Sequence, residues 1–198
     1  NYPLIGDPEL KIAKLYDMLP AEAGNTAAAV GWYLAHDRAP LPHLFRVLAL
    51  FWALRDPIGN PRAWIGELLP DADSLEPQPR AELHWTAVMS ALDAGDDREA
   101  LEDGERLAPL LDDIDDHYLE AVSHLALAWT APLAGDRDEA LRQASLSVDQ
   151  LRSQDEPFWT ASALVTAGAL EAYAGRYEEA LGHLREGSDL AQGFDSAW

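Results

Sequence analysis

The chain contains no cysteine among its 198 residues. Without thiols it forms no disulfide bond, holds no metal through thiolates and uses no sulfur nucleophile, and this composition fits a reducing compartment. Basic side chains are also few, because 14 Lys and Arg stand against 35 Asp and Glu, which gives a formal net charge of −21. Since this sign repels phosphates, we expect no nucleic-acid binding by this segment.

Long apolar runs are absent as well. The longest candidate, residues 47–54, is far shorter than the ~20 residues of a membrane span, so we expect no membrane insertion. The first three residues, Asn1 to Pro3, lack the basic start of a signal peptide, and we interpret the chain as a soluble, cytoplasmic fragment. Hydrophobic residues make up 48% of the sequence and include seven Trp, which is enough material for a globular core.

One short segment recurs twice at a spacing of 40 residues. Its three copies are Ala94–Leu101, Ala134–Leu141 and Ala174–Leu181. In each copy a Gly supplies the left-handed turn that ends one helix, and the polar residues after it begin the next. The small residues Ala100, Ala140 and Ala180 would let the two helices of a hairpin cross closely.

The spacing of apolar residues at three, four and seven positions indicates helices throughout, with no strand pattern. We therefore predict an all-α fold, a right-handed α-solenoid of antiparallel helical hairpins with a 40-residue period. Predicted helices cover about 25–37, 42–55, 61–69, 78–94, 97–111, 117–134, 137–153, 157–174 and 177–192.

The sequence stops within the first turn of a further repeat, so we expect a truncated array with an open end. Such an end should expose apolar side chains or cover them by association with another molecule. The candidate association residues are Leu190, Phe194 and Trp198.

The segment Gly175-Arg176-Tyr177-Glu178-Glu179-Ala180-Leu181 resembles the turn and second helix of a tetratricopeptide repeat (TPR). The chain departs from that family in its period, 40 rather than about 34 residues. It also has His84, His124 and Leu164 where a bulky aromatic residue is expected early in the first helix. The resemblance implies a binding scaffold rather than an enzyme.

The segment 25–198 resembles the helical repeat region of large ATP-binding LuxR-type transcription regulators. Residues 25–32, 51–55 and 155–161 carry this likeness. In those regulators such a region serves sensing and association, which implies a protein partner, self-association or a small-molecule effector here. No phosphate-binding Gly-x-x-x-x-Gly-Lys loop and no basic recognition helix are present in the sequence.

The first 20 residues, Asn1 to Pro20, resemble the middle of a one-cysteine peroxiredoxin. We assign residues 1–24 to this segment, expect one short helix in it, and interpret the chain as a chimera joined between Pro20 and Thr26. The resemblance implies an alternative function, a fragment of a peroxiredoxin-type antioxidant enzyme. That fragment would be inactive, because no position supplies the peroxidatic cysteine.

No pattern of catalytic, cofactor-binding or metal-binding residues stands out. The acidic run Asp112–Asp116 lacks the spacing and the glycine of an EF-hand loop, and the adjacent Glu178 and Glu179 point in different directions. His84 and His124 occupy equivalent positions of adjacent repeats, where packed, hydrogen-bonded histidines are favoured over a ligand site. The tryptophans from Trp32 to Trp159 are interpreted mainly as core residues.

We therefore predict a non-catalytic scaffold for protein interaction or effector sensing. In stacked hairpins the first helices line the concave groove, so polar side chains of these helices are the binding candidates. They are Glu82, His84, Ser90, Glu120, Ser123, His124, Thr130, Thr160, Ser162, Thr166 and Glu171.

Overall fold

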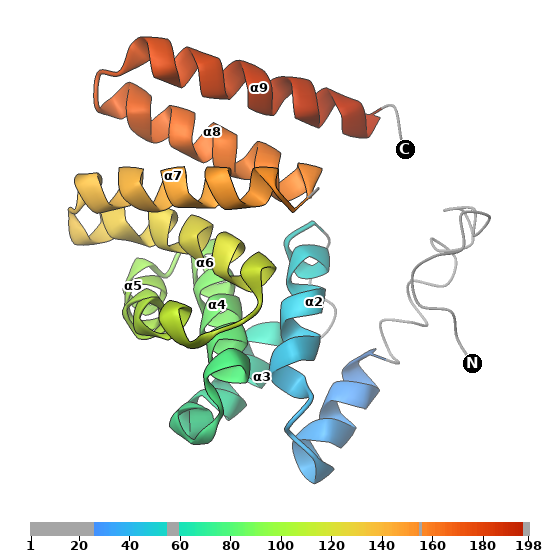
Figure 1. Cartoon of the computed structure of the whole chain (residues 1–198). Coiled ribbons are helices and arrows are strands. Elements are labelled where there is room, and N and C mark those ends of the chain that lie inside the picture. The colour runs from blue at the N-terminus through green and yellow to red at the C-terminus, as the bar shows by residue number, and fades with distance from the viewer. Residues whose placement is uncertain (1–25, 55–59, 155, 196–198) are drawn as a thin grey trace.

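The computed structural model describes residues 26–54, 60–154 and 156–195 (Figure 1). All regular structure in these ranges is helical, which confirms the all-α prediction. The peroxiredoxin-like segment, residues 1–24, lies outside the described residues. The helices are residues 26–36, α2 (Leu41–Leu54), α3 (Pro61–Leu68), α4 (Pro77–Ala94), α5 (Asp97–Leu107), α6 (His117–Thr130), α7 (Arg137–Arg152), α8 (Pro157–Tyr173) and α9 (Tyr177–Asp195).

Helices that follow one another in the sequence pack as pairs. α4 lies against α5, α6 against α7, and α8 against α9, while α7 also packs on α8 and α2 on α4. In Figure 1 the helices α6 to α9 follow one another from the middle of the molecule to its top. The helices α2 and α4 lie below them and are strongly inclined to α7, α8 and α9. The chain therefore builds outward pair by pair, and most contacts join neighbouring helices.

The three recurring glycines form the same turn in the structure. Gly95, Gly135 and Gly175 have φ angles of 70°, 79° and 79°, the left-handed region that side chains disfavour. The amide after each glycine donates to the carbonyl four residues before that glycine, at 2.8–3.0 Å. In the first two turns Asp96 and Asp136 then cap the next helix by accepting from an amide three residues later.

We expect Gly175→Ala to lower the free energy of unfolding by about 1 kcal/mol, because alanine is strained at a positive φ. Gly182→Ala is the matched control on the same hairpin. It lies inside α9, and a Cβ added there meets nothing within 4 Å. Since alanine favours helix more than glycine does, this variant should gain about 0.5–1 kcal/mol. Urea denaturation measures both, and a loss in both variants would contradict the turn assignment.

Short 3-10 segments end three of the helices earlier than the sequence pattern suggests. They are η1 (Leu69–Ser74), η2 (Ala108–Asp113) and η3 (Ala131–Ala134). Each has a proline at its second residue, and proline lacks the amide hydrogen that would continue the α-helical pattern. The predicted helix 117–134 therefore ends as an α-helix at Thr130.

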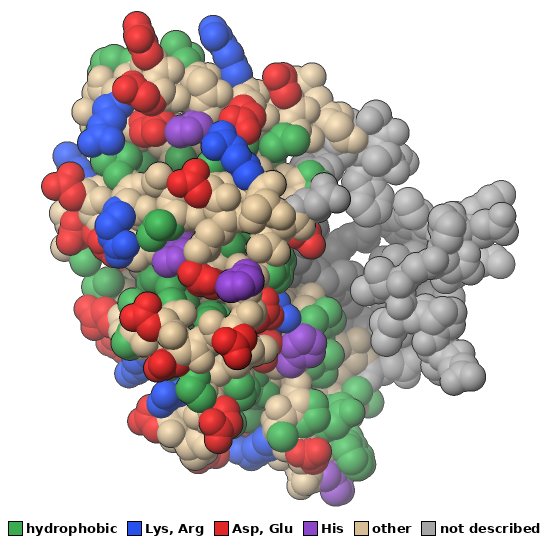
Figure 2. Space-filling view, in the orientation of Figure 1, with side chains coloured by type: hydrophobic (Ala, Val, Ile, Leu, Met, Phe, Trp, Pro, Cys, Tyr) green, Lys and Arg blue, Asp and Glu red, His purple; other side chains and the backbone are tan. Residues whose placement is uncertain are grey.

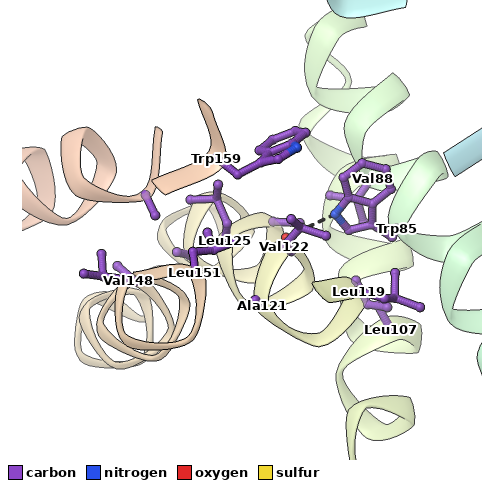
Figure 3. Close-up of a cluster of buried hydrophobic side chains, with 14 of the residues drawn as sticks. Trp85, Val88, Leu107, Leu119, Ala121, Val122, Leu125, Val148, Leu151 and Trp159 are labelled. Carbon is purple, nitrogen blue, oxygen red and sulfur yellow. Dashed lines mark hydrogen bonds between the residues drawn. The ribbon is translucent and has the colours of Figure 1, made fainter. Parts of the chain in front are cut away.

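The core consists of two clusters of buried side chains. The larger one spans α4 to α8 together with Ala49 of α2, and it includes Trp85, Leu125, Leu151 and Trp159. Figure 3 shows the rings of Trp85 and Trp159 next to each other, with Val122 beside them. The smaller cluster joins residues 26–36, α2, α3, η1 and α4.

The predicted crossing residues Ala100, Ala140 and Ala180 are all buried, as a close approach of paired helices requires. Trp32 departs from the core interpretation, because it is 54% exposed and stacks on His36 with ring centroids 4.8 Å apart. His36 lies one turn after Trp32 on the same helix, so the tryptophan makes this contact on the surface rather than in the core.

Candidate functional site

The two repeat-equivalent histidines are buried and join the helices of their pairs. His84 Nδ1 lies 2.9 Å from Asp103 Oδ1, and His124 Nδ1 lies 2.6 Å from Gln143 Oε1. Both partners come 19 residues after the histidine. This is the packing role that the sequence favours for histidines at these positions.

The third pair, α8 and α9, is also joined by a histidine, but the histidine lies on the second helix of the pair. Leu164 stands where the first two pairs have histidine, and the residue 19 positions later is His183. Its Nδ1 lies 2.8 Å from Glu171 Oε2, so a histidine again links α8 to α9. The candidate residue Glu171 is thus engaged within its own helix pair.

Glu82 is buried in a polar cluster that ties α2 to α4 and α6. Its Oε1 lies 2.9 Å from His43 Nδ1 and 3.1 Å from Arg46 Nε. The same guanidinium lies 3.4 Å from Asp116 and stacks over the ring of Tyr118, 5.6 Å from its centroid. Burial raises the pKa of Tyr118 to about 12, so its hydroxyl stays protonated at neutral pH.

The remaining predicted groove residues also contact neighbouring helices. Gln150 donates to Glu120 Oε1 at 2.7 Å, and Trp129 donates to Thr166 Oγ1 at 2.9 Å. Thr130 is buried where α6 approaches α5, so close that a Cβ on Gly104 would lie 2.9 Å from Thr130 Oγ1.

The candidates described so far contact several different helices, and the structure does not gather them on one exposed surface: Glu82, His84, Glu120, His124, Thr130, Thr166 and Glu171. Four of them are buried: Glu82, His84, His124 and Thr130. Of the wider set, Ser123 and Thr160 are buried too, whereas Ser90 and Ser162 are partly exposed. The binding role of these residues stays a prediction.

One face of α8 is accessible along most of the helix. We call it the α8 face; it consists of Ser162, Val165, Ala169 and Tyr173, which follow one another at spacings of three and four residues. Val165 is 46% exposed and Tyr173 is 86% exposed, and none of the four side chains is charged. Of the four, only Ser162 is among the polar groove residues expected from the sequence, although the helical spacing of the others can be read from the sequence.

A cavity of about 460 Å³ lies between α2, α3 and α4. Its apolar wall consists of Ala49, Trp52, Pro61 and Met89. Its polar wall consists of Asn60, Arg62, Thr86, Ser90 and Asp93, with Ala94 at the end of α4.

Most polar groups of the cavity wall are already engaged. Arg62 donates to Asp96 at 2.7 Å and also pairs with Glu99, and Thr86 donates to the carbonyl of Glu82 at 2.8 Å. Asp93 forms no ion pair with any residue in the described ranges, and partial burial raises the pKa of its carboxyl above the ordinary value.

Of the predicted association residues, the structure describes the side chain of Leu190 alone. Leu190 is partly buried and packs against the larger core cluster, so part of its surface is already covered. The side chain of Phe194 and all of Trp198 lie outside the described residues.

Within the described ranges, no group of three or more His, Asp and Glu side chains is arranged to hold a metal ion. In the same part of the chain, no helix combines the length and the apolar character that crossing a membrane demands. No protein-family model matches the chain, and no curated protein sequence matches it significantly.

Proposed function

We propose that this chain is a non-catalytic binding scaffold, a TPR-like α-solenoid of helical hairpins with a 40-residue period that holds a protein segment on its surface. The three left-handed turns at Gly95, Gly135 and Gly175 and the packed pairs that they join support the repeat architecture. The likeness to the sensing region of LuxR-type regulators supports a role in association.

The α8 face is the observation that carries the proposal. Soluble proteins expose single apolar side chains everywhere, but a continuous uncharged row along one helix marks an interaction surface. The row runs over three turns and ends in an almost fully exposed tyrosine, a residue type enriched at binding hot spots. Leu133, one period before Tyr173, is also apolar and 38% exposed, which extends the pattern to the preceding pair.

The charge of the chain indicates the kind of segment that binds. With a net charge of −21, the protein attracts basic partners over a distance and repels acidic ones. Acidic side chains are spread over the described part of the surface seen in Figure 2. Glu156 is exposed at the start of α8, whereas Glu171 in its last turn is paired with His183 of α9. The occupant is therefore a basic segment with apolar side chains at helical spacing.

A labelled amphipathic Leu/Lys helical peptide tests this proposal in a fluorescence anisotropy titration. We expect Tyr173→Ala to weaken its binding at least about tenfold, because an exposed aromatic residue at a binding surface contributes much of the contact energy. Leu181→Ala is the matched control, since Leu181 is 51% exposed but belongs to α9. It should change the dissociation constant by less than about twofold.

A Leu/Glu peptide of the same pattern should not bind, because its charge has the sign of the protein. Thermal melts of each variant check that both remain folded. Equal losses in Tyr173→Ala and Leu181→Ala, or equal binding of the two peptides, would contradict a specific basic site on the α8 face.

A further inference from the structure

The cavity between α2, α3 and α4 has the size of a small-molecule site. Ligand-binding cavities commonly measure about 300–1,000 Å³ and combine an apolar wall with a few polar groups. This cavity, about 460 Å³ in volume, falls in that range. It lies in the first half of the described chain, on helices other than α8, so it is separate from the surface proposed above.

The charges on the cavity wall do not cancel. Arg62 and Asp93 are its charged side chains among the described residues. The Arg62 guanidinium is already held by two carboxylates of α5, Asp96 and Glu99. Asp93 is exposed and forms no ion pair with any described residue, so among the described charges nothing competes for its carboxylate at the cavity.

The rest of the wall favours an apolar body beside that carboxylate. The indole of Trp52 and the flexible side chain of Met89 offer a large polarisable surface. An aromatic ring also attracts a cation through its face. The hydroxyl of Ser90, which forms no hydrogen bond to the described residues, is available to orient a polar head group.

We propose that this cavity binds a small organic cation, with an ammonium head paired with Asp93 and an apolar body against Trp52 and Met89. Anionic ligands are excluded by the same carboxylate and by the charge of the whole chain. The ammonium can belong to a free amine or to the side chain of a lysine residue, and the two sources share this chemistry.

Isothermal titration of the full chain with phenethylamine tests the proposal against phenethyl alcohol, which has the same shape but no charge. We expect the amine to bind at least about tenfold more tightly than the alcohol. In Asp93→Asn the amine should lose about tenfold in affinity and the alcohol should bind as before, because only the ion pair is removed.

Asp149→Asn is the matched control, since this exposed carboxylate lies on α7 and outside the cavity wall. It should leave phenethylamine binding unchanged. Met89→Trp, which fills the cavity, should abolish the binding of both compounds while leaving the thermal melt cooperative. Tyr173→Ala should not affect phenethylamine, so a failure of the α8 face and a failure of the cavity are distinguished.

Competition with N-acetyl-lysine amide separates the two sources of the cation. Displacement of phenethylamine assigns the cavity to a lysine side chain, and no displacement assigns it to free amines; either result supports a cation site. Equal affinity for amine and alcohol, no binding of the amine, or equal losses in Asp93→Asn and Asp149→Asn would overturn the proposal.

Discussion

Trp85→Ala is expected to lower the free energy of unfolding by about 4 kcal/mol, the range typical of large aromatic residues cut back to alanine in a core. Trp85 is 2% exposed, and its ring meets that of Trp159 edge to face at a centroid distance of 5.9 Å. Its Nε1 donates to the carbonyl of Val122 at 3.1 Å, so the substitution also removes a buried hydrogen bond between α4 and α6.

This single side chain joins three helices, α4, α6 and α8, which explains the size of the expected effect (Figure 3). Trp32→Ala is the control, because the same residue type is half-exposed there and should cost about 0.5 kcal/mol. Urea denaturation followed by far-UV circular dichroism measures both. A loss for Trp85→Ala no larger than for Trp32→Ala would mean that α4 does not pack on α6 and α8 as described.

His84→Leu is expected to lower the free energy of unfolding by about 3 kcal/mol. The substitution removes the partner of the buried Asp103 carboxylate, which His84 Nδ1 meets at 2.9 Å. The remaining partner is the exposed guanidinium of Arg106 at 3.3 Å. A buried charge that has lost its main partner lowers the free energy of unfolding by several kcal/mol. A buried neutral polar group that has lost its partner lowers it by less.

Asp103→Gln is the informative companion to His84→Leu. It recreates at the first helix pair the contact that His124 and Gln143 form at the second. We expect a loss below about 1 kcal/mol, because a neutral amide can still accept from the imidazole. Chemical denaturation at neutral pH compares the two variants. If Asp103→Gln destabilises as much as His84→Leu, the two contacts are not equivalent.

The local structure around the turns could be predicted from the sequence, because it depends on nearby residues. Gly95, Gly135 and Gly175 require a left-handed conformation, and the alanines that follow must fit a close helix crossing. The early ends of the helices are also local, since each follows from a proline such as Pro132. The predicted all-α class followed from these features and from the apolar spacing.

The direction of the polar side chains could not be predicted in the same way. The repeat places His84 and His124 on first helices, but it does not say which neighbouring helix each one faces. The residues 19 positions later, Asp103 and Gln143, stand at equal spacing from the two histidines, but α5 and α7 contain many other polar residues, so this spacing alone does not single them out. Only the packed structure shows that these pairs are buried.

The cluster around Arg46 and the cavity depend on contacts that the repeat does not contain. Arg46 reaches Glu82 and Asp116, residues that lie far from it in the sequence. The pairing of Arg62 with Asp96, which leaves Asp93 unneutralised, likewise arises only when α3 meets the start of α5. Such long-range polar contacts have no periodic signature that a single sequence could reveal.

Chemical-shift mapping by NMR of the labelled chain with the Leu/Lys peptide tests most directly whether the protein binds through its α8 face. We predict that the largest changes on titration occur at Ser162, Val165, Ala169 and Tyr173, and that they are lost in Tyr173→Ala. Changes confined to α5, α7 and α9, or spread evenly over the chain, would contradict the proposed scaffold function.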